Sequence, residues 1–64
     1  MSFNKLDSLY DGLQNIINDS QNDVTKFVDG NSSAGTRVRK AMQTIKSLAQ
    51  EVRIEVQKQK NKQF

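Results

Sequence analysis

The apolar residues of this chain recur at intervals of three and four, a spacing that places side chains on one face of an α-helix. They run from Phe3 to Val28 in the first half and from Val38 to Val56 in the second. Between them lies the segment DGNSSAG, whose residue types are typical of turns, and no proline interrupts either half. The pattern predicts an all-α fold in one domain, 1–64. We expect an antiparallel helical hairpin: helix about 3–28, turn 29–34, helix about 35–60 and a frayed C-terminus.

The apolar spacing of the first helix weakens at residues 18–23, where six polar residues follow one another and only Ser20 falls on the apolar face. Asn, Asp and Ser disfavour helix interiors because their side chains compete for backbone hydrogen bonds. The helix either continues through this segment or breaks there. We favour continuation because Val24, Phe27 and Val28 return to the same face.

Two helices of this length carry more apolar surface than a single pairing covers. Two hairpins packed as a four-helix bundle would cover it, so we predict a homodimer or a higher homo-oligomer. Tyr10 is placed near the seam between chains. Ile54 lies outside the row of apolar residues on the second helix, and we interpret it as a second apolar contact between chains. The residues assigned to the core or the dimer interface are Leu13, Ile17, Met42, Ile45, Leu48, Ala49, Val52 and Val56.

Charge divides the chain into two halves. Residues 1–31 hold two lysines and five aspartates, a net charge of −3, whereas residues 32–64 hold eight basic residues and two glutamates, a net charge of +6. The halves attract each other as antiparallel helices, or the basic half binds a polyanion, and both can hold at once.

A basic line runs along the second helix at steps of seven residues. It is open to two interpretations: a solvated flank of the helix, or a ridge that follows the phosphates of a nucleic acid. Its members are Arg39, Lys46, Arg53 and Lys60.

The start of the second helix also has two interpretations. The backbone N–H groups of residues 33–36 are carried by small residues, and Arg37, Arg39 and Lys40 follow, as in a phosphate-binding helix start. Alternatively this is a capped turn, with Ser32 or Ser33 as the cap. In that case Arg37 pairs with Asp29 or Asp23.

Several classes of protein are disfavoured by composition. The chain has no cysteine and no histidine, and no nucleophile–base pair or metal-ligand set is apparent, so we expect no enzyme activity, no cofactor and no metal. No apolar run approaches the ~20 residues of a membrane span, and the N-terminus lacks the apolar core of a signal peptide. We therefore expect no membrane partner and a cytoplasmic location.

The stretch from Lys26 to Gln57 resembles the bacterial linker-histone-like proteins, the chlamydial histone-like family that also has short members. The shared pattern is a lysine near a helix end, a Gly-Asn turn, small residues, and an Arg-x-Arg-Lys start to a long helix. These are Lys26, Gly30, Asn31, Ala34, Gly35, Arg37, Arg39 and Lys40.

The resemblance implies a nucleoid-associated, DNA-binding protein with a dimerising helical domain, in which Arg37, Arg39 and Lys40 contact phosphates. Longer members end in a tail rich in Lys, Ala and Pro, which these 64 residues do not include, and the first helix here is acidic. Both departures argue against strong DNA condensation by this segment alone. A dimer with two basic patches is expected to bridge or bend DNA weakly, without sequence preference.

Our leading hypothesis is a histone-like protein of the bacterial nucleoid that binds double-stranded DNA non-specifically as a homodimer and serves chromosome organisation. The expected phosphate contacts are Arg37, Arg39, Lys40, Lys46, Arg53 and Lys60. The alternative is a small helical-bundle interaction module that binds no nucleic acid, in which the charge division only fixes helix pairing and partner choice.

Overall fold

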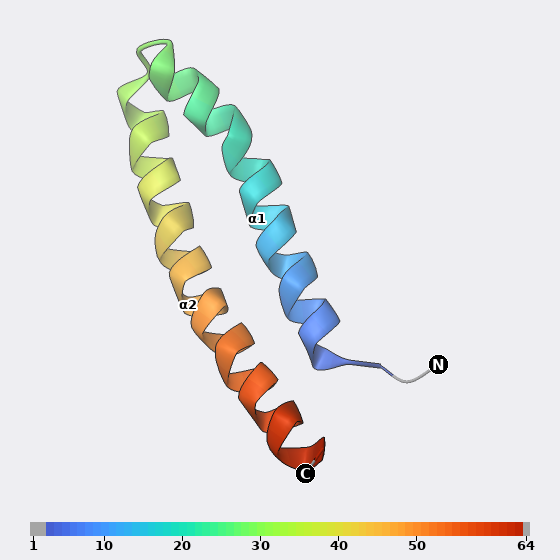
Figure 1. Cartoon of the computed structure of the whole chain (residues 1–64). Helices are drawn as coiled ribbons and strands as arrows, with labels where there is room; N and C mark the ends of the chain where they lie inside the picture. The colour runs from blue at the N-terminus through green and yellow to red at the C-terminus, as the bar shows by residue number, and fades with distance from the viewer. Residues whose placement is uncertain (1–2, 64) are drawn as a thin grey trace.

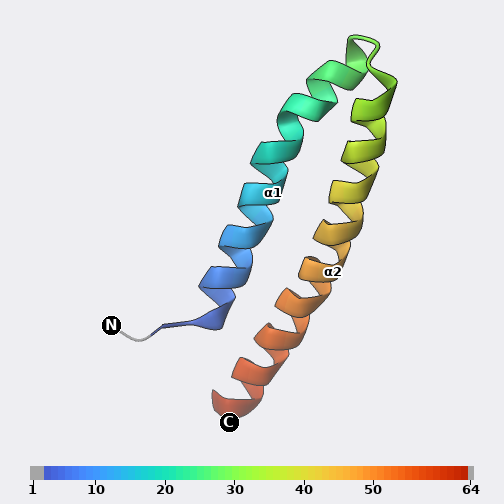
Figure 2. The same ribbon diagram turned by 180° about the vertical axis from the view of Figure 1, so that it is seen from behind.

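The computed structural model describes residues 3–63, with side chains as far as residue 62. Two helices, α1 (Lys5–Val28) and α2 (Ser32–Gln63), run antiparallel and lie side by side along α1's length (Figures 1 and 2). The described residues contain no strand. The all-α fold and the helical hairpin predicted from the apolar spacing are thereby confirmed.

Helix α1 is continuous through the polar segment 18–23, as favoured from the sequence. Its start is capped by Asn4, whose side-chain oxygen accepts a hydrogen bond from Leu6 N at 2.9 Å. Ser20 is only 7% exposed, and its hydroxyl donates to the carbonyl of Ile17 at 3.0 Å. The hydroxyl therefore has a partner within its own helix, so burying it leaves no unsatisfied polar group.

The connection between the helices is shorter than predicted, because Asn31 rather than a serine caps α2. The Asn31 side-chain oxygen accepts from Ala34 N at 3.3 Å and from Ser33 Oγ at 2.8 Å. Helix α2 therefore begins at Ser32 instead of near residue 35, and it continues to Gln63 instead of fraying from residue 60. Gly30 adopts φ 107°, the left-handed conformation that ends α1.

The seam between the helices follows alternating steps of three and four on both. On α1 the residues that follow these steps are each buried or half-buried; they are Leu6, Leu9, Leu13, Ile16, Ser20 and Asp23. On α2 the corresponding residues are Ala34, Val38, Ala41, Ile45, Leu48, Val52, Glu55 and Gln59. The seam becomes polar at its open end, where the amides of Asn4 and Gln59 exchange two hydrogen bonds of 3.3 and 2.8 Å.

The hairpin is a single layer of helices, measuring 52 × 22 × 11 Å. Among the described residues Ala34 is the one buried hydrophobic residue, and no large side chain is fully buried. Within the predicted core, Leu13, Ile45, Leu48 and Val52 lie half-buried in the seam. The others, which are Ile17, Met42, Ala49 and Val56, are exposed. One chain therefore leaves both broad faces of its helix pair uncovered.

Two glycines are expected to respond to alanine in opposite directions. A Cβ at Gly12 would lie 3.9 Å from Leu48 Cδ1, an ordinary contact, so Gly12→Ala is expected to stabilise the fold by up to about 1 kcal/mol through helix propensity. Gly30→Ala places a side chain in the left-handed region and is expected to cost about 1 kcal/mol. Urea unfolding followed by circular dichroism measures both. A loss of stability in Gly12→Ala would mean that α1 and α2 lie closer together at Gly12 than the 3.9 Å contact with Leu48 indicates.

Candidate functional site

The six cations predicted to contact phosphate are all exposed on α2. Arg37 Nε lies 2.9 Å from Asp23 Oδ1 on α1, and this is the one ion pair among the described residues. The Arg37 side chain remains 49% exposed. The other five cations therefore point their charge into solvent, where no carboxylate of the described chain offsets it.

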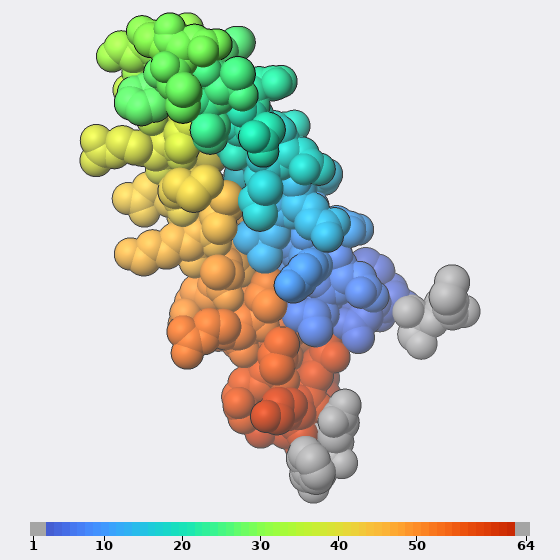
Figure 3. Space-filling model, turned by 45° about the horizontal axis from the view of Figure 1, so that its top comes forward, coloured from blue at the N-terminus to red at the C-terminus, as the bar shows by residue number. Residues whose placement is uncertain are grey.

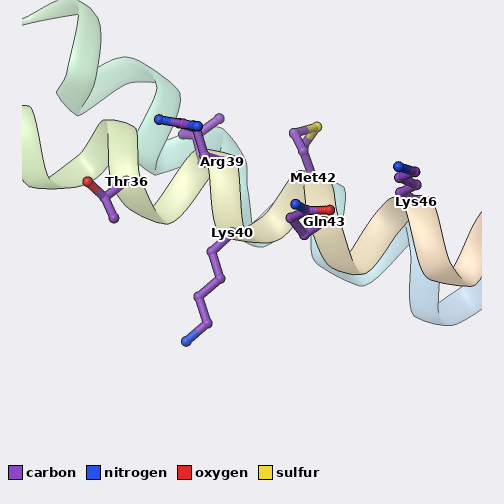
Figure 4. A pocket seen from close by; sticks show the side chains of 7 residues that line it. Thr36, Arg39, Lys40, Met42, Gln43 and Lys46 are labelled. Atoms are coloured by element: carbon purple, nitrogen blue, oxygen red, sulfur yellow. The ribbon is translucent and has the colours of Figure 1, made fainter.

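The structure divides these cations between two sides of α2. At about 100° per residue, Arg37 and Lys40 share one side, while Arg39 shares the other with the rest of the basic line. Figure 4 shows Lys40 pointing away from Arg39, Met42 and Lys46. The Arg-x-Arg-Lys motif therefore surrounds the start of α2 with charge instead of forming one cluster.

A shallow hollow of about 560 Å³ lies on α2 between these cations (Figure 4). It is lined by Thr36, Val38, Arg39, Lys40, Met42, Gln43 and Lys46. Long side chains from this yellow part of α2 stand away from the molecule on the side opposite α1 (Figure 3). The hollow is open and its edges are basic, so it suits contact with an extended polyanion better than enclosure of a small molecule.

The helix start itself is occupied by the chain's own capping group. Ala34 N–H, one of the groups considered for phosphate, already donates to Asn31, and Ala34 is fully buried. Arg37 is paired with Asp23, which was one of the two partners expected for a capped turn. The geometry thus supports the capped-turn interpretation.

A second hollow, of about 440 Å³, was not anticipated from the sequence. It lies at the turn end of the hairpin and is lined by Val24, Phe27, Ser32, Gly35, Thr36, Val38 and Arg39. A Cβ on Gly35 would lie 2.5 Å from Phe27 Cδ1, so the absence of a side chain there admits the Phe27 ring. Gly35 belongs to the segment DGNSSAG, whose residue types indicate a turn, and for that reason its role in helix packing was missed.

Other kinds of site find no support in the part of the chain that the structure describes. Residues 3–62 hold no group of three or more His, Cys, Asp or Glu side chains placed to bind a metal ion. No described helix is long and apolar enough to cross a membrane.

The fold and the exposed cations together define a small helical hairpin with a basic outer surface on its second helix. The chain belongs to the family described as histone H1-like protein Hc1, whose pattern it matches over residues 3–62. This confirms the resemblance and extends it from residues 26–57 to nearly the whole chain. The family is one of structural, DNA-packaging proteins and not of enzymes. Comparison with curated proteins and with solved structures gave no match.

Proposed function

We propose that this chain is a histone-like protein of the bacterial nucleoid that binds double-stranded DNA without sequence preference, as a homodimer. The observation that carries the proposal is the set of five exposed cations on α2 that no described carboxylate pairs. Membership in a histone H1-like family supports DNA as the polyanion.

Phosphate contact rather than base readout fits this surface. Residues 3–63 form two helices and no third one that could place a recognition helix in the major groove. Lysine and arginine at steps of seven residues follow α2, whose 32 residues span about 48 Å, and such cations bind the DNA backbone whatever the sequence.

Binding is expected to weaken steeply with salt, because each neutralised phosphate releases counterions. We expect a labelled duplex of random sequence, titrated by fluorescence anisotropy, to give a straight plot of log K against log salt concentration. The slope should be about −0.9 for each phosphate contacted, and a second, unrelated sequence should give the same line. Absence of binding at low salt would refute the proposal and favour the interaction module.

A further inference from the structure

The two broad faces of the hairpin differ sharply in chemistry. On both helices, the residues that follow every second seam residue (Leu9, Ile16 and Asp23 on α1; Ala41, Leu48 and Glu55 on α2) are apolar and exposed. These residues, the apolar face, are Tyr10, Ile17 and Val24 on α1 and Met42, Ala49 and Val56 on α2. On the opposite broad face, the residues that precede the other seam residues (Leu6, Leu13 and Ser20 on α1; Val38, Ile45, Val52 and Gln59 on α2) are instead mostly charged. They are Lys5, Gly12, Asp19, Arg37, Thr44, Glu51 and Lys58.

The apolar residues of the two helices belong to the same face of the molecule. Antiparallel helices in a hairpin are related by an approximate two-fold axis perpendicular to their plane, so equivalent positions project to the same side. The hollow at the turn end shows this directly, because it is lined by Val24 and Gly35, which follow seam residues Asp23 and Ala34. One continuous apolar strip therefore runs along one side of the single helical layer.

The size of this face matches what a second hairpin needs. Along the roughly 36 Å of α1 and across the 22 Å width of the layer, each chain would cover roughly 800 Å², the area per partner of a standard stable interface. The exposed fractions of Tyr10, Ile17 and Met42 are 56%, 50% and 45%, so this area is largely side chain that the monomer leaves in water.

Two hairpins can stack on this face in two orientations. With both turns at the same end, α2 lies against α1 of the partner. With the turns at opposite ends, each helix lies against its own copy. The orientations differ in which side chains meet.

Side-chain volume favours the first orientation. The apolar residues of α1 are bulky, whereas α2 contributes Ala49 and the bare backbone of Gly35 beside Met42 and Val56. Bulky residues of α1 then lie against the smaller Ala49 and Gly35 of the partner's α2, whereas α1 against α1 would set the bulky residues Tyr10, Ile17 and Val24 against one another.

Charge favours the same orientation. The basic line borders the apolar face on α2, and the equivalent residues on α1 are Asp7, Gln14, Gln21 and Val28. Placing α2 against its copy would align two basic lines. Placing α2 against the partner's α1 brings Arg53 close to the partner's Asp7 in height along the bundle. Within one hairpin, Asp7 and Arg53 both lie between the Asn4–Gln59 hydrogen bond and the Gly12–Leu48 contact, so the two residues are at the same height.

We therefore propose that a second copy of this chain docks on the apolar face with both turns at the same end, and that Arg53 pairs with the partner's Asp7. This inference rests on the proposed homodimer and adds its interface and direction. It also brings the Arg37–Lys40 segments of both chains to one end of the bundle, which forms a single basic end.

The chain has no cysteine, so single introduced cysteines report the orientation without background. Gln14 and Lys46 are exposed, border the apolar face and lie at similar levels. A mixture of Gln14→Cys and Lys46→Cys chains, refolded together and oxidised, is expected to form the mixed disulfide in most chains. Gln14→Cys alone is expected to form little, because its two copies lie diagonally across the bundle, beyond the ~7 Å that a disulfide spans.

The matched control uses the neighbouring residues on the other side, Asn15→Cys mixed with Ser47→Cys, and should remain reduced. Efficient oxidation of Gln14→Cys alone would overturn the orientation. A dimer by sedimentation in which neither pair is oxidised, or in which the control pair is, would overturn the interface. Sedimentation of the reduced proteins as 7.3 kDa monomers would instead overturn the homodimer itself.

Discussion

Ile17→Asp is expected to convert the dimer into monomers, while Ile54→Asp leaves it intact. The two isoleucines are matched in exposure, at 50% and 48%, and in chemistry. Ile17 lies on the apolar face, whereas Ile54 lies on the outer surface of α2, away from both the seam and that face. Two-fold symmetry introduces each substitution twice, so an effect of about 2 kcal/mol per site weakens association on the order of a thousandfold.

Sedimentation equilibrium at micromolar concentration measures this difference directly. We expect the Ile17→Asp protein to sediment near the 7.3 kDa of one chain and Ile54→Asp near twice that mass. Circular dichroism should show a parallel loss of helix in Ile17→Asp, because a two-helix layer without a fully buried large side chain has little stability alone. If Ile54→Asp dissociated the dimer instead, the interface would lie on the outer surface of α2 and not on the apolar face. Ile54 would then make the contact between chains that the sequence analysis assigned to it.

The hairpin was predictable because local sequence and packing agree along most of the chain. Steps of three and four place Leu13 and Ile45 in the seam whichever way the turn is built, and Gly30 supplies the one left-handed residue the turn requires. The bounds were less predictable because Asn31, Ser32 and Ser33 are all good caps. Only the hydrogen bonds of Asn31 decide among them, and those depend on how the turn closes.

The candidate site was harder to predict than the fold. Consecutive basic residues such as Arg39 and Lys40 are adjacent in sequence but project about 100° apart on a helix. Whether Arg37 is available depends on Asp23, fourteen residues away and on the other helix. The sequence identified the charges, therefore, but the ion pair and the sides on which they lie come from the helix pairing.

Replacing Arg39 and Lys40 by glutamine is expected to remove most DNA binding while leaving the hairpin folded. Neither side chain is buried or ion-paired in the described structure, so their loss removes no packing, and Arg37 keeps its pair with Asp23. A dimer loses four phosphate contacts. The magnitude of the slope of log K against log salt concentration is then expected to fall by roughly 3 to 4, with binding on the order of a thousandfold weaker near 0.1 M salt.

The control Lys58→Gln/Lys62→Gln removes the same charge from the other end of α2. If affinity followed net charge alone, both double variants would weaken binding equally. If the basic end formed by the two turns is the DNA-binding surface, the control should keep nearly the full salt slope. Equal losses would mean that cations along the whole length of α2 contribute to phosphate binding, so that the interface extends beyond the turn end. Anisotropy titrations of both variants, with dimer mass confirmed by sedimentation, decide between these two surfaces.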